Sequence, residues 1–212
     1  MATDLIEIDA EAPSQKAIER AASAIRRGRV VAIPTDSLYL VVADPFNLHA
    51  VGLVFVAKGR EIHRSLPLLV AGVLMAEDLA KELSSRFYLL ARRFWPGPLT
   101  IIVPASAKVP LKVTGNTGRL ALRQSRSNVA AALLEKLGQP LIATSANISG
   151  QPTCRSGIDV FGKMDGRIDL VLDGGLCTGL GGTTVDITEP AWQLIREGSV
   201  SAKEIAECLK VR

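Results

Sequence analysis

The chain has 212 residues, of which 48% are hydrophobic and 22% are charged, and its formal net charge is +4. This length suits one domain with a sizeable core, and the composition excludes a disordered chain, which would be poor in apolar residues. The small positive charge permits a phosphate-bearing partner, but it fits an ordinary soluble surface equally well.

Apolar periodicity and capping residues predict the elements of the first half. Ser14 caps a helix that Gly28 ends, and the apolar face of this helix comprises Ala17, Ile18, Ala21, Ala22 and Ile25. Strands are predicted over residues 29–33 and 66–71, and helices over residues 48–57, 76–83 and 85–94. Trp95-Pro96-Gly97-Pro98 predicts a tight turn, because two prolines and a glycine exclude a helix.

The second half is richer in predicted strands. They cover residues 99–103, 119–123, 141–144, 168–172, 183–187 and 193–196. A helix over residues 128–137 is closed by Gly138, and Ser201 with Glu204 forms a capping box for the last helix. The stretch 174–182 holds five glycines among nine residues, which predicts a mobile loop.

The irregular alternation of helices and strands predicts a single α/β domain over residues 1–212 with a mixed sheet. We find no internal repeat and no stretch that resembles a linker. The core of this domain is expected to cover about residues 14–200.

Residues that ligate metals are few. They are Cys154, Cys177, Cys208, His49 and His63. None of their spacings is typical of a metal site, so we expect no protein-bound metal, and we expect free thiols in a reducing cytoplasm. The acidic start does not resemble a signal peptide, and the longest apolar run, residues 66–76, is too short to span a bilayer, so we expect no membrane partner.

Four short polar segments each lie at or just after a predicted strand or helix. They are Pro34-Thr35-Asp36-Ser37-Leu38-Tyr39, Lys58-Gly59-Arg60, Thr144-Ser145-Ala146-Asn147-Ile148-Ser149-Gly150 and Thr183-Thr184-Val185-Asp186. Each supplies hydroxyl, amide or cationic groups that bind an anionic ligand. Taken singly, each segment fits a turn, a loop or a helix end. Taken together they indicate one nucleotide site, and it is non-standard because the chain has neither a Walker A lysine motif nor Gly-x-Gly-x-x-Gly.

Two arginines end predicted strands, Arg123 after Leu122 and Arg196 after Ile195. An arginine at the end of a strand is usually solvated. The two side chains share one edge of the sheet only if their strands run in the same direction, which the sequence leaves open.

Together these residues resemble the YrdC-like family, the threonylcarbamoyl-AMP synthases. The resemblance covers about residues 17–200 and includes Leu66-Pro67-Leu68-Leu69-Val70, Phe94-Trp95-Pro96-Gly97-Pro98-Leu99-Thr100 and Leu172-Asp173-Gly174-Gly175. It implies a twisted mixed sheet, flanked by helices, around a large cationic cavity. Longer members carry a further C-terminal domain, for which this chain is expected to be too short.

The resemblance also implies a reaction. ATP, L-threonine and bicarbonate give threonylcarbamoyl-adenylate and pyrophosphate, with Mg²⁺ accompanying the ATP. Partner proteins of a threonylcarbamoyl-transferase complex then modify tRNA. Such an adenylation requires positioning and charge neutralisation more than a covalent nucleophile.

Site residues follow from the positions that match the family's motifs. Lys58 and Arg60 are implied to be catalytic and to bind ATP together with Ser145, Asn147 and Arg196. The residues implied to bind threonine are Thr35, Tyr39, Arg123 and Thr183.

Three departures from the family pattern bear on amino-acid specificity. Leu40-Val41-Val42 stands where the family has Gly-Leu-Gly, and bulky residues there are expected to narrow a wall of the cavity. Residues 123–128, Arg-Gln-Ser-Arg-Ser-Asn, replace Arg-x-Pro-x-His-Pro and lose its ring-locked turn. Gly182 replaces a serine, for which Thr184 is a candidate substitute.

Two other functions stay open. A non-catalytic module would bind tRNA or double-stranded RNA through the same cationic surface, although the chain lacks the aromatic residues that stack on single strands. A carbamoyl-transfer relative of hydrogenase-maturation proteins ranks last, since that role normally comes with extra domains.

Overall fold

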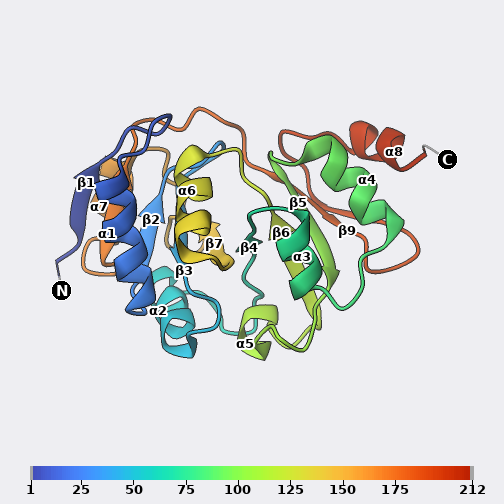
Figure 1. Cartoon of the computed structure of the whole chain (residues 1–212), viewed down its shortest axis with the longest axis horizontal. Helices are drawn as coiled ribbons and strands as arrows, with labels where there is room; N and C mark the ends of the chain where they lie inside the picture. The colour runs from blue at the N-terminus through green and yellow to red at the C-terminus, as the bar shows by residue number, and fades with distance from the viewer. Residues whose placement is uncertain (1, 211–212) are drawn as a thin grey trace.

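Ten strands form one continuous sheet in the computed structural model, which describes residues 2–210 (Figure 1). They are β1 (Asp4–Glu7), β2 (Val31–Ile33), β3 (Leu40–Ala43), β4 (Leu68–Leu69), β5 (Leu99–Pro104), β6 (Arg119–Arg123), β7 (Leu141–Ser145), β8 (Leu170–Asp173), β9 (Thr183–Asp186) and β10 (Gln193–Arg196). Their spatial order is β1-β8-β2-β3-β7-β4-β6-β5-β9-β10. Parallel and antiparallel pairs alternate irregularly, so the predicted mixed sheet is confirmed.

Eight helices accompany the sheet over the described residues. They are α1 (Gln15–Arg26), α2 (Leu48–Lys58), α3 (Val73–Leu79), α4 (Ser85–Phe94), α5 (Leu111–Thr114), α6 (Asn128–Leu137), α7 (Gly157–Met164) and α8 (Ala202–Lys210). The predicted cap of α1 is confirmed, because the Ser14 side chain accepts a hydrogen bond from the backbone N–H of Ala17. The capping box of α8 is confirmed as well, with Ser201 and Glu204 bonded reciprocally.

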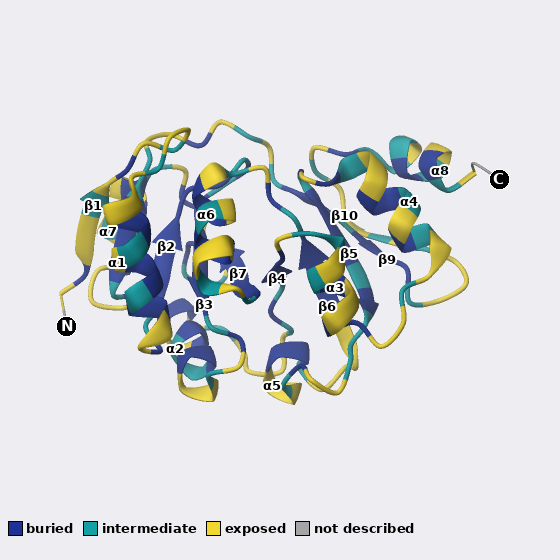
Figure 2. Ribbon diagram, in the orientation of Figure 1, coloured by how far each residue is buried: buried dark blue, intermediate teal, exposed yellow. Residues whose placement is uncertain are grey.

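The inner strands are mostly buried, the edge strands β1 and β10 are largely exposed, and the helices turn their polar faces outward (Figure 2). On one face of the sheet, α1 and α6 pack against each other and over β2, β3, β7 and β8. A larger core on the other face contains side chains of α2 and α7, and it continues under α3, α4 and α8 beside β5, β6 and β9. Because this larger core draws on both halves of the sheet, the described residues fold as one unit.

β4 is shorter than predicted. The sequence indicated a strand over residues 66–71, but only Leu68 and Leu69 pair on both sides. Pro67 has no N–H to donate, and the N–H of Leu66 bonds the carbonyl of Val113 instead. This two-residue strand is the only link in the sheet between β7 and β6.

Some elements were not predicted, namely β1, β3, α5 and α7. β3 is buried along its whole length and shows no polar alternation, as is usual for a central strand covered on both faces. α3 begins three residues earlier than predicted and ends at Leu79, because Ala80 leaves the helix to form a bridge with Ala105.

Candidate functional site

Lys58 is the last residue of α2, and its side chain is fully buried. Its ammonium Nζ donates to the backbone carbonyl of Ser145, to the carbonyl of Asn147 at 2.9 Å and to the side-chain Oδ1 of Asn147 at 3.2 Å. The Ser145 hydroxyl donates to the same Oδ1 at 2.6 Å. Three of the predicted ATP-binding residues therefore form one hydrogen-bonded group.

Arg60 lies beside this group. Gly59 takes the left-handed conformation at the end of α2 and turns the chain so that Arg60 follows. The guanidinium donates through Nη2 to the carbonyl of Ser65 at 2.9 Å, whereas its Nε is buried and has no partner. Burial, and then the charge of Arg60, lower the pKa of Lys58 to about 8.

No ion pair joins Lys58 or Arg60 to a carboxylate within residues 2–210. Buried charges are normally paired, so two neighbouring cations served only by neutral acceptors favour an anionic ligand. The unpartnered Nε of Arg60 supports the same conclusion, because orphaned buried donors are rare.

A second group forms around Arg123, which is 7% exposed. Its Nε donates to the carbonyl of Gly97 at 3.0 Å, its Nη1 to the hydroxyl of Ser37 at 3.0 Å and its Nη2 to the carboxylate of Asp36 at 2.8 Å. A guanidinium has five N–H groups, so one on each terminal nitrogen stays available. Asp36 and Ser37 had been singled out only as parts of a motif, and no spacing in the sequence links them to Arg123.

Arg196 joins the second group. β6 and β10 run in the same direction through the intervening pairings of β5 and β9, so the condition that the sequence left open is met. The Nε of Arg196 donates to the carbonyl of Gly182 at 3.0 Å. Arg196 is exposed, but partial desolvation of its guanidinium, and then the charge of Arg123, lower its pKa. The two arginines and Asp36 leave this group with one net positive charge.

The segment 35–39 connects the two groups. The carbonyl of Tyr39 accepts from the N–H of Ala146, next to Ser145, and the Thr35 hydroxyl lies 3.3 Å from that of Ser37. The Tyr39 hydroxyl is directed elsewhere, because it bonds Asp173 and the carbonyl of Gly175.

Several hydroxyls of the predicted threonine site already have protein partners. The Thr35 hydroxyl donates to the carbonyl of Leu38 at 2.6 Å. The Thr183 hydroxyl is fully buried, where it donates to Val200 and accepts from Gly198. Thr183 and Tyr39 thus support neighbouring loops, and their contact with threonine stays a prediction.

The glycine-rich stretch 174–182 lies against the segment 35–39. A Cβ placed on Gly179 would lie 2.3 Å from the carbonyl oxygen of Asp36. Arg155 holds this loop through bonds to the carbonyls of Cys177 and Gly179. The sequence had not singled out Arg155, since nothing near it marks a contact with a segment more than twenty residues away.

The three departures from the family pattern have different structural surroundings. Leu40, Val41 and Val42 belong to β3 and pack into the cores on its two faces. At Gly182, a Cβ would lie 3.0 Å from the carbonyl oxygen of Pro98 and 3.3 Å from Nη1 of Arg123. Ser125 and Ser127 both bond the segment that precedes Tyr39.

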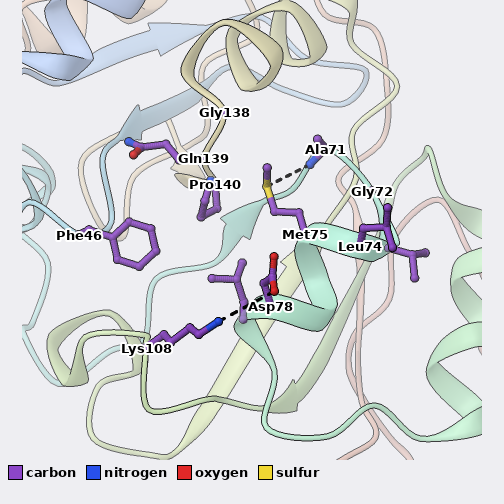
Figure 3. Close-up of a pocket in the computed structure, with 12 residues that line it drawn as sticks. Phe46, Ala71, Gly72, Leu74, Met75, Asp78, Lys108, Gly138, Gln139 and Pro140 are labelled. Atoms are coloured by element: carbon purple, nitrogen blue, oxygen red, sulfur yellow. Dashed lines mark hydrogen bonds and ion pairs between the residues drawn. The ribbon is translucent and has the colours of Figure 1, made fainter.

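A cavity of about 700 Å³ lies away from these groups (Figure 3). Apolar side chains such as Phe46, Leu74 and Met75 line it, and Lys108 and Asp78 lie 3.9 Å apart at its edge. It contains none of the predicted site residues. A smaller cavity of about 290 Å³ includes Thr35 and Asp36. The large cationic cavity stays a prediction.

Within residues 2–210, no three His, Cys, Asp or Glu side chains gather as metal ligands would. The three cysteines are buried free thiols. No helix in the described part of the chain is both long enough and apolar enough to cross a bilayer.

Comparison with known proteins relates this chain to one protein family. A family model named for Sua5, YciO and YrdC, and described as "Telomere recombination", matches residues 23–198. A threonylcarbamoyl-AMP synthase of Pyrococcus abyssi is 38% identical over 91% of this chain and 57% of its own length. One from Xanthomonas campestris is 34% identical over 76% of this chain and 88% of its own length.

Solved structures show the same fold. P. abyssi Sua5 in complex with L-threonine has a TM-score of 0.94 and 36% identity over 98% of this chain and 61% of that one. E. coli YciO has a TM-score of 0.89 at 23% identity and covers 96% of this chain and 99% of that one. The chain spans little more than half the length of the P. abyssi protein.

Proposed function

This chain belongs to the Sua5/YciO/YrdC family, and we propose that it is a threonylcarbamoyl-AMP synthase. It joins ATP, L-threonine and bicarbonate into threonylcarbamoyl-adenylate, with release of pyrophosphate and water. The observation that carries the proposal is a pair of neighbouring cations, the fully buried Lys58 and the half-buried Arg60, neither of which has a carboxylate partner among the described residues. Two uncompensated charges suit the triphosphate of ATP.

To bind the Lys58 ammonium, ATP must replace one of the hydrogen bonds that this group makes within the protein. All three protons of the Lys58 ammonium already have acceptors, and the longest contact is the 3.2 Å bond to Oδ1 of Asn147. We infer that a phosphate oxygen replaces this acceptor. Asn147 and the Ser145 hydroxyl then turn to the nucleotide, and Arg60 donates its free Nε–H. Arg196, in the group around Arg123, is the remaining residue proposed to bind ATP.

The amino acid is assigned to the group around Arg123. Its single net positive charge suits one carboxylate, and the remaining N–H groups of the Arg123 guanidinium provide donors. Thr35, Tyr39 and Thr183 shape the surroundings. The carbamate formed from the amine and bicarbonate then attacks the α-phosphorus, and pyrophosphate leaves in line.

Mg²⁺ enters as part of the ATP substrate. The described residues offer no cluster of acidic or imidazole ligands, and Mg²⁺ commonly binds substrate phosphates while it keeps most of its waters. The protein residues therefore hold the phosphates, and the ion neutralises the charge between them.

The product is a labile mixed anhydride, which requires an acceptor. We propose that proteins of a threonylcarbamoyl-transferase complex take it up and modify tRNA in the cytoplasm. The relatives named threonylcarbamoyl-AMP synthase support the synthesis of this adenylate. RNA binding without catalysis receives no support from a specific contact.

The proposal is tested by following pyrophosphate release with ATP, Mg²⁺, bicarbonate and threonine, each omitted in turn. We expect release only with all four. Replacing Lys58 with alanine should weaken ATP binding by about 1.5–3 kcal/mol, because a charge-assisted contact is lost. Lys108→Ala, at the remote cavity, is the matched control and should bind ATP normally. Folded protein that binds RNA in a salt-dependent manner but neither binds nor consumes ATP would refute the synthase assignment.

A further inference from the structure

The guanidinium of Arg123 is held on a carboxylate that has its own support. Oδ1 of Asp36 accepts from Nη2 of Arg123 at 2.8 Å and also from the hydroxyl of Ser125. Ser125 is 7% exposed, as is Arg123. A serine hydroxyl has one proton, and here it points to Asp36, so its oxygen is free to accept. It does accept, from the backbone N–H of Ser127 at 3.2 Å.

Ser127, the next residue in this series of bonds, anchors the series to Pro34, the residue that follows β2. The Ser127 hydroxyl donates to the carbonyl of Pro34 at 3.0 Å and caps α6 by accepting from the N–H of Ala130. The stretch 125–127 is therefore bonded to the stretch 34–36 at two points. No proline ring constrains residues 125 and 128, and side-chain hydrogen bonds fix the turn instead.

We propose that Ser125 and Asp36 are positioning residues for Arg123. Ser125 fixes the carboxylate of Asp36, and Asp36 fixes the plane of the guanidinium. Each terminal nitrogen of Arg123 keeps one N–H, and Nη1 lies beside Gly182, where a Cβ would be only 3.3 Å from it. This assignment rests on the proposed function for its substrate, since a carboxylate of an amino acid is the ligand that those N–H groups would bind.

The carboxylate of Asp36 has a second role, which is to offset the positive charges of Arg123 and Arg196. Arg196 lies close enough for the charge of Arg123 to lower its pKa. With Asp36 ionised, the group carries one net positive charge, and without it the two arginines repel each other directly. Removal of Asp36 should therefore disturb the arginines more than removal of Ser125, which changes only the geometry.

The matched pair Ser125→Ala and Ser127→Ala tests the proposal. Ser125→Ala removes the hydroxyl that bonds Asp36, whereas Ser127→Ala removes the helix cap and the bond to Pro34 but leaves the bond between Ser125 and Asp36 in place. We expect Ser125→Ala to raise the KM for threonine about three- to tenfold, with the KM for ATP unchanged. Ser125→Thr should restore the wild-type KM for threonine. Ser127→Ala should lower the Tm and leave both KM values near those of the wild type.

A second measurement does not depend on turnover. In protein labelled with ¹⁵N-arginine, rotation about the Cζ–Nε bond of Arg123 should be slow in the wild type and in Ser127→Ala. It should be faster in Ser125→Ala and fastest in Asp36→Ala. Arg123→Lys identifies the signal.

Equal effects of the two serine variants on KM and on rotation would overturn the proposal, because they would show only loss of stability. If the wild type releases no pyrophosphate with threonine, the proposed function fails, and the rotation rates alone then decide whether Ser125 and Asp36 position Arg123.

Discussion

Lys58 is the residue whose protonation should govern nucleotide affinity. In the folded protein, burial and the charge of Arg60 lower its pKa from 10.5 to about 8. A bound triphosphate stabilises the ammonium and raises this pKa again. Below pH 8 the ammonium is already protonated, so binding takes up no proton there. Above pH 8 it does, so affinity falls as the pH rises.

We therefore predict that ATP affinity falls above pH 8 by at most about tenfold per pH unit, the limit for one linked proton. Calorimetry between pH 7 and 9.5 measures it, and Lys58→Met should bind weakly with no such decline. Arg60 gives no decline of its own, because a guanidinium stays protonated in this range. A wild-type affinity that is flat to pH 9.5 would contradict the lowered pKa of Lys58.

Sequence reasoning identified residues better than their partners. The pattern Lys58-Gly59-Arg60 indicated a helix that ends at Gly59 with a cation on each side of it, and Gly59 does take the left-handed conformation typical of a helix end. The pairing of Arg123 with Asp36 joins residues 87 positions apart. Such a contact depends on the crossing of distant segments, for which no local rule exists.

At the scale of elements, composition says least about the structure of the loop 174–182. Five glycines indicated mobility, yet the loop packs against Asp36 and accepts bonds from Arg155 and Tyr39. One glycine, Gly179, is required by the close approach of backbone atoms. Glycine content alone does not distinguish flexibility from close packing.

Two glycines of this loop provide a matched comparison. A Cβ at Gly179 would lie 2.3 Å from the Asp36 carbonyl oxygen, whereas a Cβ at Gly181 would have no atom within 4 Å, and neither residue has a positive φ. We predict that Gly179→Ala lowers the free energy of unfolding by about 1–3 kcal/mol. Gly181→Ala should change it by no more than about 1 kcal/mol, in the stabilising direction. Urea unfolding measures both, and equal losses would show that the loop does not pack on Asp36.

The same loop is predicted to respond to substrate. It lies over the segment that holds Arg123, so closure there would shield the adenylate from water. We expect amide hydrogen exchange over residues 174–182 to slow when ATP and threonine are added together. If the amides near Lys58 become protected and those of the loop do not, the loop is a connector and not a flap.

Elements whose ends are marked by local residues were more predictable than the central strands β3 and β4. α4, α6, β6 and β10 have the predicted bounds, because capping residues, glycines and polar flanks mark their ends. β3 was missed because a strand buried on both faces lacks alternation, and β4 was overestimated because an apolar run does not reveal where pairing stops.

At the scale of the whole molecule, the two charged groups belong to different halves of the sheet. Lys58, Ser145 and Asn147 lie with β3 and β7, whereas Arg123 and Arg196 end β6 and β10. In the sheet, only the two-residue strand β4 connects these halves. The shared core beneath them is continuous, so the halves do not separate, but a ligand that contacts both groups adds a further link.

We therefore predict that ATP and threonine stabilise the protein cooperatively. Each ligand alone raises the Tm according to its own affinity. Bound together with bicarbonate omitted, so that no turnover occurs, they should raise the Tm by more than the sum of the two separate shifts, because each orders part of the site that the other uses. Arg196→Ala should retain a shift with ATP but lose the excess, since it removes the nucleotide contact in the half that holds Arg123. Additive shifts in the wild type would show that the two groups bind their ligands independently, which would contradict a single site that spans the sheet.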